Sequence, residues 1–529
     1  MKKIVFLILV VAGMTACENP EFFELERPVE KPWLTLTEFE RAPVGAYRRC
    51  FASSEWSNNI VMWTCFQTSV ADDGALATAG ELTLGWYRDT EANKSWLDND
   101  VFPSVYSGIV SICDALQFVE EKGGNPYPTI SQEDKKNNLD RIVGELHFVR
   151  GFLYYYMATL YCTAYVPGGT NDERQIPLVT KRPLGYTDAT NVPLGSVQEV
   201  WDLILSDFKA AYDLLPERYI EGKMHIAYSA GRANQFSAAA MLARTYFALG
   251  NYPEARKYAS FVIDQNGGDY DLSEDPIEAF NKSTNTRGKE VLLYSPNFDK
   301  AVGATTYNMA TYNHRLPENP CPWNLVYLHP DIVKRLGWMD NPKSDTTINQ
   351  AARIDKRFQQ LIAVREPSNV PEADRLPDRY YETRDELKWR TLVADKALRG
   401  PEIQWTNIAI LRLAEMYLTR SICAFKAGDK QDAANDLNVV RKRAWDENVA
   451  GQSYESSAHF VTAANITEAV IEDERIVEMF CEGDRINYLR GLKVDIPPGE
   501  HDGGPIPYTS KKLVWKVPQR EVDLNQSYR

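Results

Sequence analysis

The stretch GRANQFSAAAMLARTYFALGNYPEARKYASFVID, residues 231–264, carries the clearest structural signal in this sequence. Its apolar residues recur at spacings of three and four, which is typical of helices that bury one face: Phe236, Ala240, Ala243, Phe247, Ala255, Tyr258, Ala259 and Val262. Between the two halves, Gly250 suits the left-handed conformation that caps a helix, and Pro253 suits a first helical turn. The stretch therefore predicts two amphipathic helices, packed closely because small alanines line their contact.

A second stretch, residues 408–444, repeats this pattern. Gly428 is followed five residues later by Ala433, just as Gly250 is followed by Ala255. Helix pairs of about 34 residues with small residues at the crossing points are typical of tetratricopeptide repeats. Because two matches fall short of an array, two unrelated helical hairpins remain an alternative.

Two more segments predict helices. Residues 139–165 are apolar over a broad surface, which indicates a central, nearly buried helix rather than a surface one. Ser196 and Glu199 form a capping-box pattern at the start of a further helix, which Pro216 ends. The sequence thus predicts an all-α fold, built on a tetratricopeptide-like scaffold of helix pairs.

Long stretches rich in Pro, Gly, Asn and aromatic residues separate the helices, chiefly residues 72–99 and 267–404. Compact domains seldom contain so much irregular chain without a function. Residues 290–294 could form a short strand within the second stretch. We expect this second stretch to fold as an irregular, loop-rich lobe mounted on the helical scaffold.

The N-terminal residues predict secretion and a lipid anchor. Lys2 and Lys3 precede an apolar run over residues 4–12, as in a secretory signal, and this run is shorter than the roughly 20 residues that span a bilayer. Residues 14–17, Met-Thr-Ala-Cys, resemble a bacterial lipobox, in which the thiol of Cys17 is acylated. An ordinary signal peptide with an unrelated cysteine is the alternative.

A tether is expected to follow the anchor. Glutamates and prolines in residues 18–31 favour an extended, solvated chain over a packed element. We therefore expect a signal peptide over residues 1–16 and a lipidated cysteine with a flexible tether over residues 17–33. The rest of the sequence contains no second apolar run long enough to span a membrane, which predicts a soluble body.

The composition excludes several classes of protein. The chain has 59 Lys and Arg against 73 Asp and Glu, a net charge of -14, whereas nucleic-acid binding requires a basic surface. The cysteines other than Cys17 are odd in number and form no CxxC pair, so we expect buried small residues rather than disulfides or a zinc site. The sequence has no HExxH spacing, phosphate-binding loop or nucleophile elbow. We expect no cofactor, no nucleic-acid partner and no enzymatic activity.

Two irregular stretches mix aromatic and polar side chains in a way that suits a sugar ligand. The apolar faces of a sugar ring stack on aromatic rings, while its hydroxyls bond to Asn, Asp and Arg. We predict these ligand-binding residues: Trp86, Arg88, Asn93 and Trp96 in the first stretch, Tyr312 and Trp323 in the second, and Asp73 in a glycine-containing loop. The alternative is a core position for each aromatic ring and a turn or helix cap for Asp73.

An acidic segment, residues 472–485, permits two interpretations. Glycosidases place two carboxylates astride the bond that they cleave. Glu478, however, stands four residues before Glu482 and three after Arg475, and these spacings form ion pairs on one helix face. We prefer the ion-pair interpretation and predict that this segment belongs to the scaffold.

Several segments, in this order, resemble the SusD-like (RagB/SusD) outer-membrane lipoproteins of Bacteroidetes-type bacteria. They are the lipobox at Cys17, an early helix over 34–47 with VGAY at 44–47, GELHFVRGFLYYY at 144–156, DFKAAYDLLP at 207–216, RLAEMYL at 412–418, the Glu-Arg and Glu-Gly-Asp-Arg motifs within 474–485, and PQREVDLN at 518–525. Gly144 and Leu146 depart from the family pattern. Each motif is weak alone, but their order and their spread over nearly the whole chain are specific.

The resemblance implies a SusD-like domain over residues 34–529, with helical repeats over about 34–265 and 405–490 and the irregular lobe over about 267–404. It implies a glycan-binding lipoprotein, anchored in the outer membrane through Cys17 and exposed at the cell surface, which delivers oligosaccharides to a SusC-like TonB-dependent transporter. The family places its glycan site on loops whose residues vary. A peptide-capturing lid, a protein scaffold and a glycoside hydrolase are the alternatives.

Overall fold

The computed structural model describes residues 33–51, 74–76, 101–280, 288–295, 326–344, 347–367, 380–384, 389–394, 396, 408–499 and 503–529. The chain divides into two compact units, Met1–Arg41 and Ala42–Arg529. The first contains α3 (Leu36–Phe39), which a capping box between Thr35 and Glu38 begins. A second helix, α4 (Arg41–Phe51), follows after Glu40, so the early helix expected over 34–47 is two helices.

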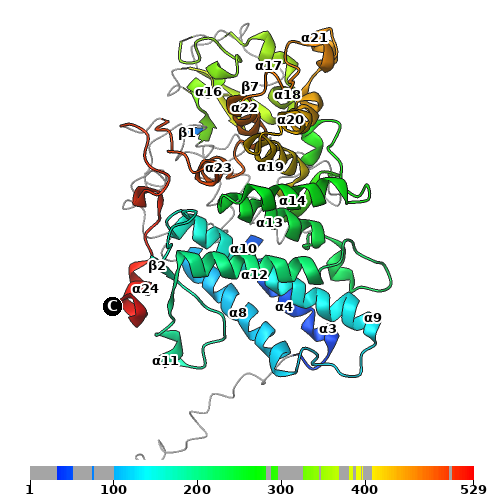
Figure 1. Ribbon diagram of the computed structural model, residues 1–529, viewed down its shortest axis with the longest axis vertical. Coiled ribbons are helices and arrows are strands. Elements are labelled where there is room, and N and C mark those ends of the chain that lie inside the picture. The colour runs from blue at the N-terminus through cyan, green and yellow to red at the C-terminus, as the bar shows by residue number, and fades with distance from the viewer. Residues whose placement is uncertain are drawn as a thin grey trace, which may run out of the picture. The chain divides into compact units, whose positions relative to one another are not determined.

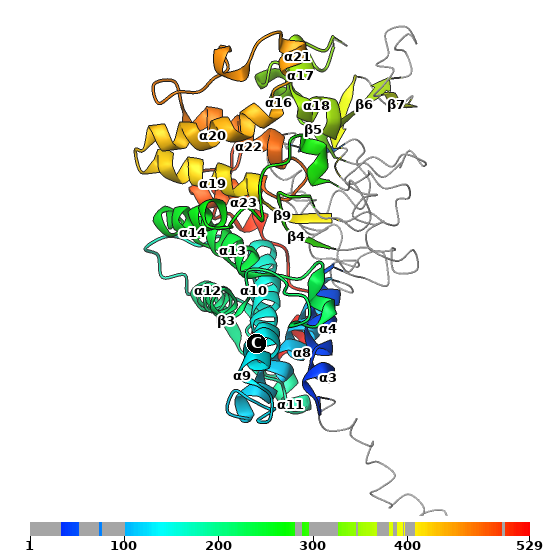
Figure 2. The ribbon, with the colours of Figure 1, turned by 90° about the vertical axis from the view of Figure 1, so that its right-hand side faces the viewer.

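Helices dominate the second unit and confirm the all-α, tetratricopeptide-like prediction. Figures 1 and 2 show the larger ones stacked in chain order, with neighbours in contact from α10 to α20. The helices of this scaffold are α8 (Phe102–Glu121), α9 (Gln132–Asp134), α10 (Arg141–Tyr161), α12 (Val197–Leu214), α13 (Gln235–Ala248), α14 (Tyr252–Asp264), α19 (Leu413–Lys426), α20 (Lys430–Ala444), α22 (Glu468–Met479) and α23 (Arg485–Leu492).

The two predicted helix pairs are α13 with α14 and α19 with α20. Gly250 and Gly428 take positive φ angles of 76° and 88° between the paired helices, a conformation that favours glycine. The alanines Ala240, Ala243, Ala255, Ala259 and Ala433 are fully buried, which lets the helices approach closely. The prediction was wrong at the start of the second pair, because Ile408–Arg412 forms strand β9 against β4 (Val291–Ser295) before the helix begins at Leu413.

The predicted central helix is α10, which contacts both α8 and α12 and is buried along nearly its whole length. Glycine permits this close packing: a Cβ added at Gly151 would lie 3.1 Å from Cβ of Asp207 on α12. The predicted capping box begins α12, where the Glu199 backbone N–H donates to Ser196 Oγ at 3.1 Å. Gly151 therefore allows α10 and α12 to pack tightly against each other.

Helix α8 differs from the expectation that the body holds no further apolar run of membrane-spanning length. By length and composition it could cross a bilayer, and it is the one helix in the described part of the chain that could. Its apolar residues are, however, largely buried against the rest of the unit, with α10 as a neighbour. This burial accounts for its composition, because a core helix needs the same apolar residues.

Short strands and helices occupy the described parts of the predicted lobe. A five-stranded sheet has the order β1-β5-β8-β6-β7, with β6 and β7 parallel and the other pairs antiparallel. Its strands are β1 (Gly74–Leu76), β5 (Val326–Leu328), β8 (Thr391–Ala394), β6 (Ile362–Pro367) and β7 (Tyr380–Arg384). The strand expected over 290–294 is β4, and a further pair joins β2 (Arg174–Pro177) to β3 (Leu194–Ser196).

Three short helices lie beside this sheet: α16 (Pro330–Arg335), α17 (Gln350–Ile354) and α18 (Lys356–Leu361). An apolar core joins them to the sheet and to α22, with Trp338 and Phe358 packed edge to face at 5.2 Å and Val477 from the helix beside them. Five cysteines, Cys50, Cys113, Cys162, Cys423 and Cys481, are free and buried, as predicted for small core residues. The limits proposed for the repeats and the lobe stay predictions.

Candidate functional site

All the predicted ligand-binding residues lie outside the described residues, and so does the predicted lipidation site. They are Trp86, Arg88, Asn93, Trp96, Asp73, Tyr312, Trp323 and Cys17. They stay predictions. The described chain nevertheless shows where the two stretches attach: β1 pairs with β5 in antiparallel register, and Leu76 lies opposite Val326. The start of the first stretch thus lies beside a strand that comes directly after Trp323 in the second stretch.

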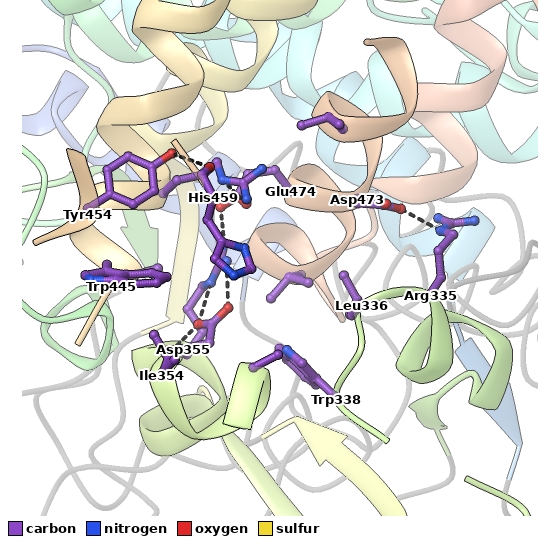
Figure 3. A pocket seen from close by; sticks show the side chains of 16 residues that line it. Arg335, Leu336, Trp338, Ile354, Asp355, Trp445, Tyr454, His459, Asp473 and Glu474 are labelled. Atoms are coloured by element: carbon purple, nitrogen blue, oxygen red, sulfur yellow. Dashed lines mark hydrogen bonds and ion pairs between the residues drawn. The ribbon is translucent and has the colours of Figure 1, made fainter. Parts of the chain in front are cut away.

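A pocket of about 330 Å³ lies in the described residues, between the lobe helices α16 to α18 and the C-terminal helices α20 and α22 (Figure 3). Aromatic, charged and aliphatic side chains line it, from segments far apart in the sequence. The residues that carry its chemistry are Arg335, Trp338, Asp355, Arg357, Arg441, Trp445, Tyr454, His459, Asp473 and Glu474.

Trp445 stands at the centre of the aromatic wall, immediately after α20 ends at Ala444. Its backbone pairs with Asp355 in an isolated antiparallel bridge, and its indole Nε1–H donates to the backbone oxygen of Gln452 at 3.0 Å. The ring centroid lies 5.8 Å from that of Tyr454 and 5.4 Å from that of His459. Backbone pairing and ring contacts together hold the indole in one orientation.

The polar wall consists of guanidinium groups and carboxylates that pair with one another. Arg335 Nε lies 2.5 Å from Asp473, and this pair is on the opposite side of the pocket from Trp445 in Figure 3. The remaining pairs are Arg357 with Asp355 at 2.8 Å, Arg357 with Glu474 at 2.5 Å, and Arg441 with Glu474 at 3.8 Å. Three cations and three anions balance, so these six side chains carry no net charge.

Burial changes the ionisation of two groups in the pocket. It raises the pKa of Asp473 above the ordinary value, although the positive charge of Arg335 acts against this change. Burial, assisted by the charge of Arg441, lowers the pKa of His459, so this ring is neutral at pH 7. The pocket therefore offers a neutral imidazole beside the indole.

The C-terminal part of the acidic segment lies in a closed cluster beside the pocket. Glu478 accepts ion pairs from Arg412 at 2.8 Å, Arg443 at 2.6 Å and Arg357 at 3.3 Å. Burial opposes the charge of Glu478, but the three guanidinium groups outweigh it and hold the pKa of this carboxylate well below its ordinary value. The ion-pair interpretation is confirmed here.

The predicted partners within this segment were nevertheless wrong. Arg475 binds Asp484 at 2.6 Å rather than Glu478. Glu482 lies beyond the end of α22 at Met479, so the four-residue helical spacing does not apply to it, and it binds Arg412 and Lys396. Glu478 and Glu482 are largely buried and already bind cations, which leaves no room for the sugar ring that a glycosidase would place between these two carboxylates.

The pocket was not predicted from the sequence. A cluster of rings follows the second helix pair within a short distance, at Trp445, Tyr454, His459 and Phe460, and this aromatic run was the available signal. The lobe residues of the pocket could not be found in this way, because Asp355 and Arg335 come about 90 to 110 residues earlier in the sequence.

The stacked helix pairs and the attached lobe of short strands define a protein of the tetratricopeptide-like helical-repeat class. Two family models match nearly consecutive parts of the chain: SusD-like_3, described as "Starch-binding associating with outer membrane", over residues 53–247, and the SusD family over residues 264–490. The chain belongs to the SusD/RagB family.

Known relatives agree with this assignment. The chain is similar to SusD-like protein P2 of Formosa agariphila, with 23% identity over 318 residues, which is 58% of this chain and 54% of that protein. The chain thus spans about half the length of the curated relative that it matches.

Solved structures show the same fold over almost the whole chain. A SusD superfamily protein from Bacteroides thetaiotaomicron has a TM-score of 0.67 at 19% identity, covering 93% of this chain and 98% of that one. A SusD-like carbohydrate binding protein from Bacteroides fragilis has a TM-score of 0.68 at 18% identity, covering 94% and 99%. At these identities the likeness concerns the fold alone.

Proposed function

We propose that this protein is a cell-surface glycan-binding lipoprotein, which captures oligosaccharides and delivers them to a SusC-like TonB-dependent outer-membrane transporter. The observation that carries the proposal is the pair of family matches, one of them to a model described as starch-binding and associated with the outer membrane. The lipobox at Cys17 supports a lipid anchor in the outer membrane, and the acidic tether supports display of the body away from the lipid surface.

The aromatic stretches are the proposed capture site. The antiparallel pairing of Leu76 with Val326 supports this assignment, because it brings the start of the first stretch to a strand that follows Trp323 closely in the second. Indole rings such as Trp86 and Trp323 can stack on sugar rings, while Arg88 and Asn93 can bond to the hydroxyls.

Binding without catalysis is the proposed activity. The solved relative from Bacteroides fragilis is named as a carbohydrate binding protein rather than an enzyme. Glu478, from the acidic segment that could suggest a glycosidase, is buried and held by three arginines. A peptide-capturing lid of the same family is the second candidate, and the experiment below separates it from a glycan lid.

The test replaces Trp86, Trp96 and Trp323 by Ala, singly and together, in the mature chain. We expect glycan binding to weaken about tenfold or more for each effective residue, which corresponds to about 1.4 kcal/mol, while Tm stays nearly unchanged. An exposed stacking ring contributes to the complex but little to folding, whereas truncation of a core Trp costs about 3–5 kcal/mol. Calorimetric titration with a panel of oligosaccharides and peptides provides the affinities, and a thermal melt provides Tm.

Two outcomes would contradict the proposal. If Tm falls by many degrees in all three variants and binding follows the folded fraction, the three tryptophans are core residues. If peptides bind and no oligosaccharide does, the protein is a peptide lid. Release of shortened sugar products during the titration would indicate a hydrolase instead.

A further inference from the structure

The pocket beside α22 has the size of a small-ligand site. Its volume of about 330 Å³ lies near the lower end of the range for ligand pockets, about 300–1,000 Å³. Such a volume suits one or two rings of a sugar rather than a long chain. The pocket also lies where the lobe meets the helical repeats, and ligand sites occur preferentially at such junctions.

The aromatic wall offers an apolar face to a ligand. Because the Trp445 Nε1–H is already bonded to the backbone of Gln452, the indole contributes its ring rather than its polar edge. Tyr454 is buried behind it, and its hydroxyl donates to Asn438 Oδ1 at 2.6 Å, so this ring supports the wall from inside. The C–H face of a pyranose can stack on a ring held in this way.

The polar wall selects for ligands without charge. The six charged side chains of the wall balance, so an anion or a cation gains little from the pocket as a whole. Sugar hydroxyls, by contrast, can accept from Arg335 and donate to Asp473 while that ion pair stays intact. Figure 3 shows this pair and Trp445 on opposite sides of the pocket, one wall for hydroxyls and one for the ring face.

From these walls we infer that the pocket is a second carbohydrate site, which binds one or two neutral sugar rings between Trp445 and the Arg335–Asp473 pair. The class of ligand rests on the proposed function, whereas the place rests on the pocket itself. The site uses none of the residues predicted on the aromatic stretches. A glycan bound at those stretches is therefore not required for a short sugar to bind here.

The experiment follows the Trp445 indole signal by NMR in the mature chain labelled with 15N-tryptophan. The Trp445→Phe variant assigns the signal, because that peak alone disappears. The chain also carries Trp86→Ala, Trp96→Ala and Trp323→Ala, which removes the proposed capture site. Maltose, cellobiose, lactose and xylobiose are the neutral probes, and glucuronic acid and glucosamine are the charged ones.

We expect at least one neutral disaccharide to shift the Trp445 signal to saturation, and the charged sugars to shift it at least tenfold more weakly. Two substitutions, Trp445→Ala and Arg335→Gln, should each weaken binding of that disaccharide at least fivefold, as measured by saturation-transfer signals from the sugar. Arg335 is half-exposed at the pocket rim, so its variant reports on binding even if loss of Trp445 disturbs folding. Trp445→Phe keeps an aromatic face and should retain binding within about threefold of the parent chain.

Three results would overturn the inference: no neutral probe moves the signal, only a charged probe moves it, or neither substitution weakens binding. None of these results contradicts the proposed capture site on the aromatic stretches. That site is tested by titrating long oligosaccharides into a chain whose pocket is intact. Conversely, unchanged binding of long oligosaccharides after loss of Trp86, Trp96 and Trp323 would contradict the proposed capture site. That result would not affect the inference about the pocket, which the NMR experiment tests separately.

Discussion

Each half of α22 carries a carboxylate, but the two carboxylates have different surroundings. In its first half, Asp473 lines the pocket, is 28% exposed and pairs with Arg335, which is itself half-exposed. In its second half, Glu478 is 1% exposed and binds three arginines from three other elements. One carboxylate borders open space, and the other closes a gap in the core.

The difference shows that the role of each carboxylate on α22 depends on which arginines the fold brings to it, not on the spacing of charges in the sequence. Arg412 ends β9, Arg443 comes from α20, and Arg357 comes from α18, so three separate segments converge on one carboxylate. Asp473 meets only the end of α16 in this way among the described elements. A buried ion pair ties elements together, whereas a rim pair leaves its oxygens available to a ligand.

The largest expected effect comes from Glu478→Gln. The substitution leaves three buried arginines without their shared anion, and we expect a loss of about 3–5 kcal/mol in the free energy of unfolding. Denaturant titration followed by circular dichroism measures it. Asp473→Asn is the matched control, with the same chemical change on the same helix and an expected effect below about 1 kcal/mol. Equal losses in the two variants would remove the distinction between the closed and the open half.

The second prediction compares how the stability of the parent chain and of Glu478→Gln depends on pH. Since the folded pKa of Glu478 lies below the unfolded value of about 4.3, its stabilisation is complete above that value and is lost as pH falls through the folded pKa. We expect unfolding free energy to fall with pH in this window, and Glu478→Gln to make the dependence shallower. Denaturant midpoints measured at a series of pH values below 5 provide the slopes. Parallel slopes in the parent and the variant would contradict a lowered pKa for Glu478.

The smallest effect concerns Asp473, whose pKa shifts in the opposite direction. A carboxylate with a raised folded pKa favours the folded state more as pH falls through that pKa, so its charge at pH 7 weakly opposes folding. We therefore expect Asp473→Asn to leave stability at pH 7 unchanged or raised by less than about 1 kcal/mol. The difference in unfolding free energy between Asp473→Asn and the parent chain should vanish below pH 4. A clear loss of stability in this variant at pH 7 would instead show that the ion pair with Arg335 stabilises the fold.

Local patterns in the sequence predicted the scaffold well. The spacing of alanines and the glycine at position 250 were enough to indicate α13 and α14, because both features act within a few residues of one another. The broad apolar surface of α10 likewise indicated its burial. The strand β9 escaped prediction because its partner β4 lies more than a hundred residues earlier, and helical and strand patterns are alike over five apolar residues.

The pocket could not be predicted for the same reason. Trp445 was visible in the sequence, but its role depends on the backbone bridge to Asp355 and on Arg335 and Asp473 opposite, which only the fold brings together. The acidic segment was recognised as a source of ion pairs, yet helical spacing named the wrong partners for Arg475 and Glu482, since α22 ends before the second of these.

The pairing of β1 with β5 also has a consequence for how the chain is made. Gly74 pairs with Leu328, so a strand that leaves the ribosome early waits for one that is synthesised much later. Contacts between such distant residues form slowly, because a long loop must close before they stabilise anything. Residues 74–76 therefore stay unpaired while about 250 further residues are synthesised, and a chaperone that covers this strand would protect the chain from aggregation at this stage.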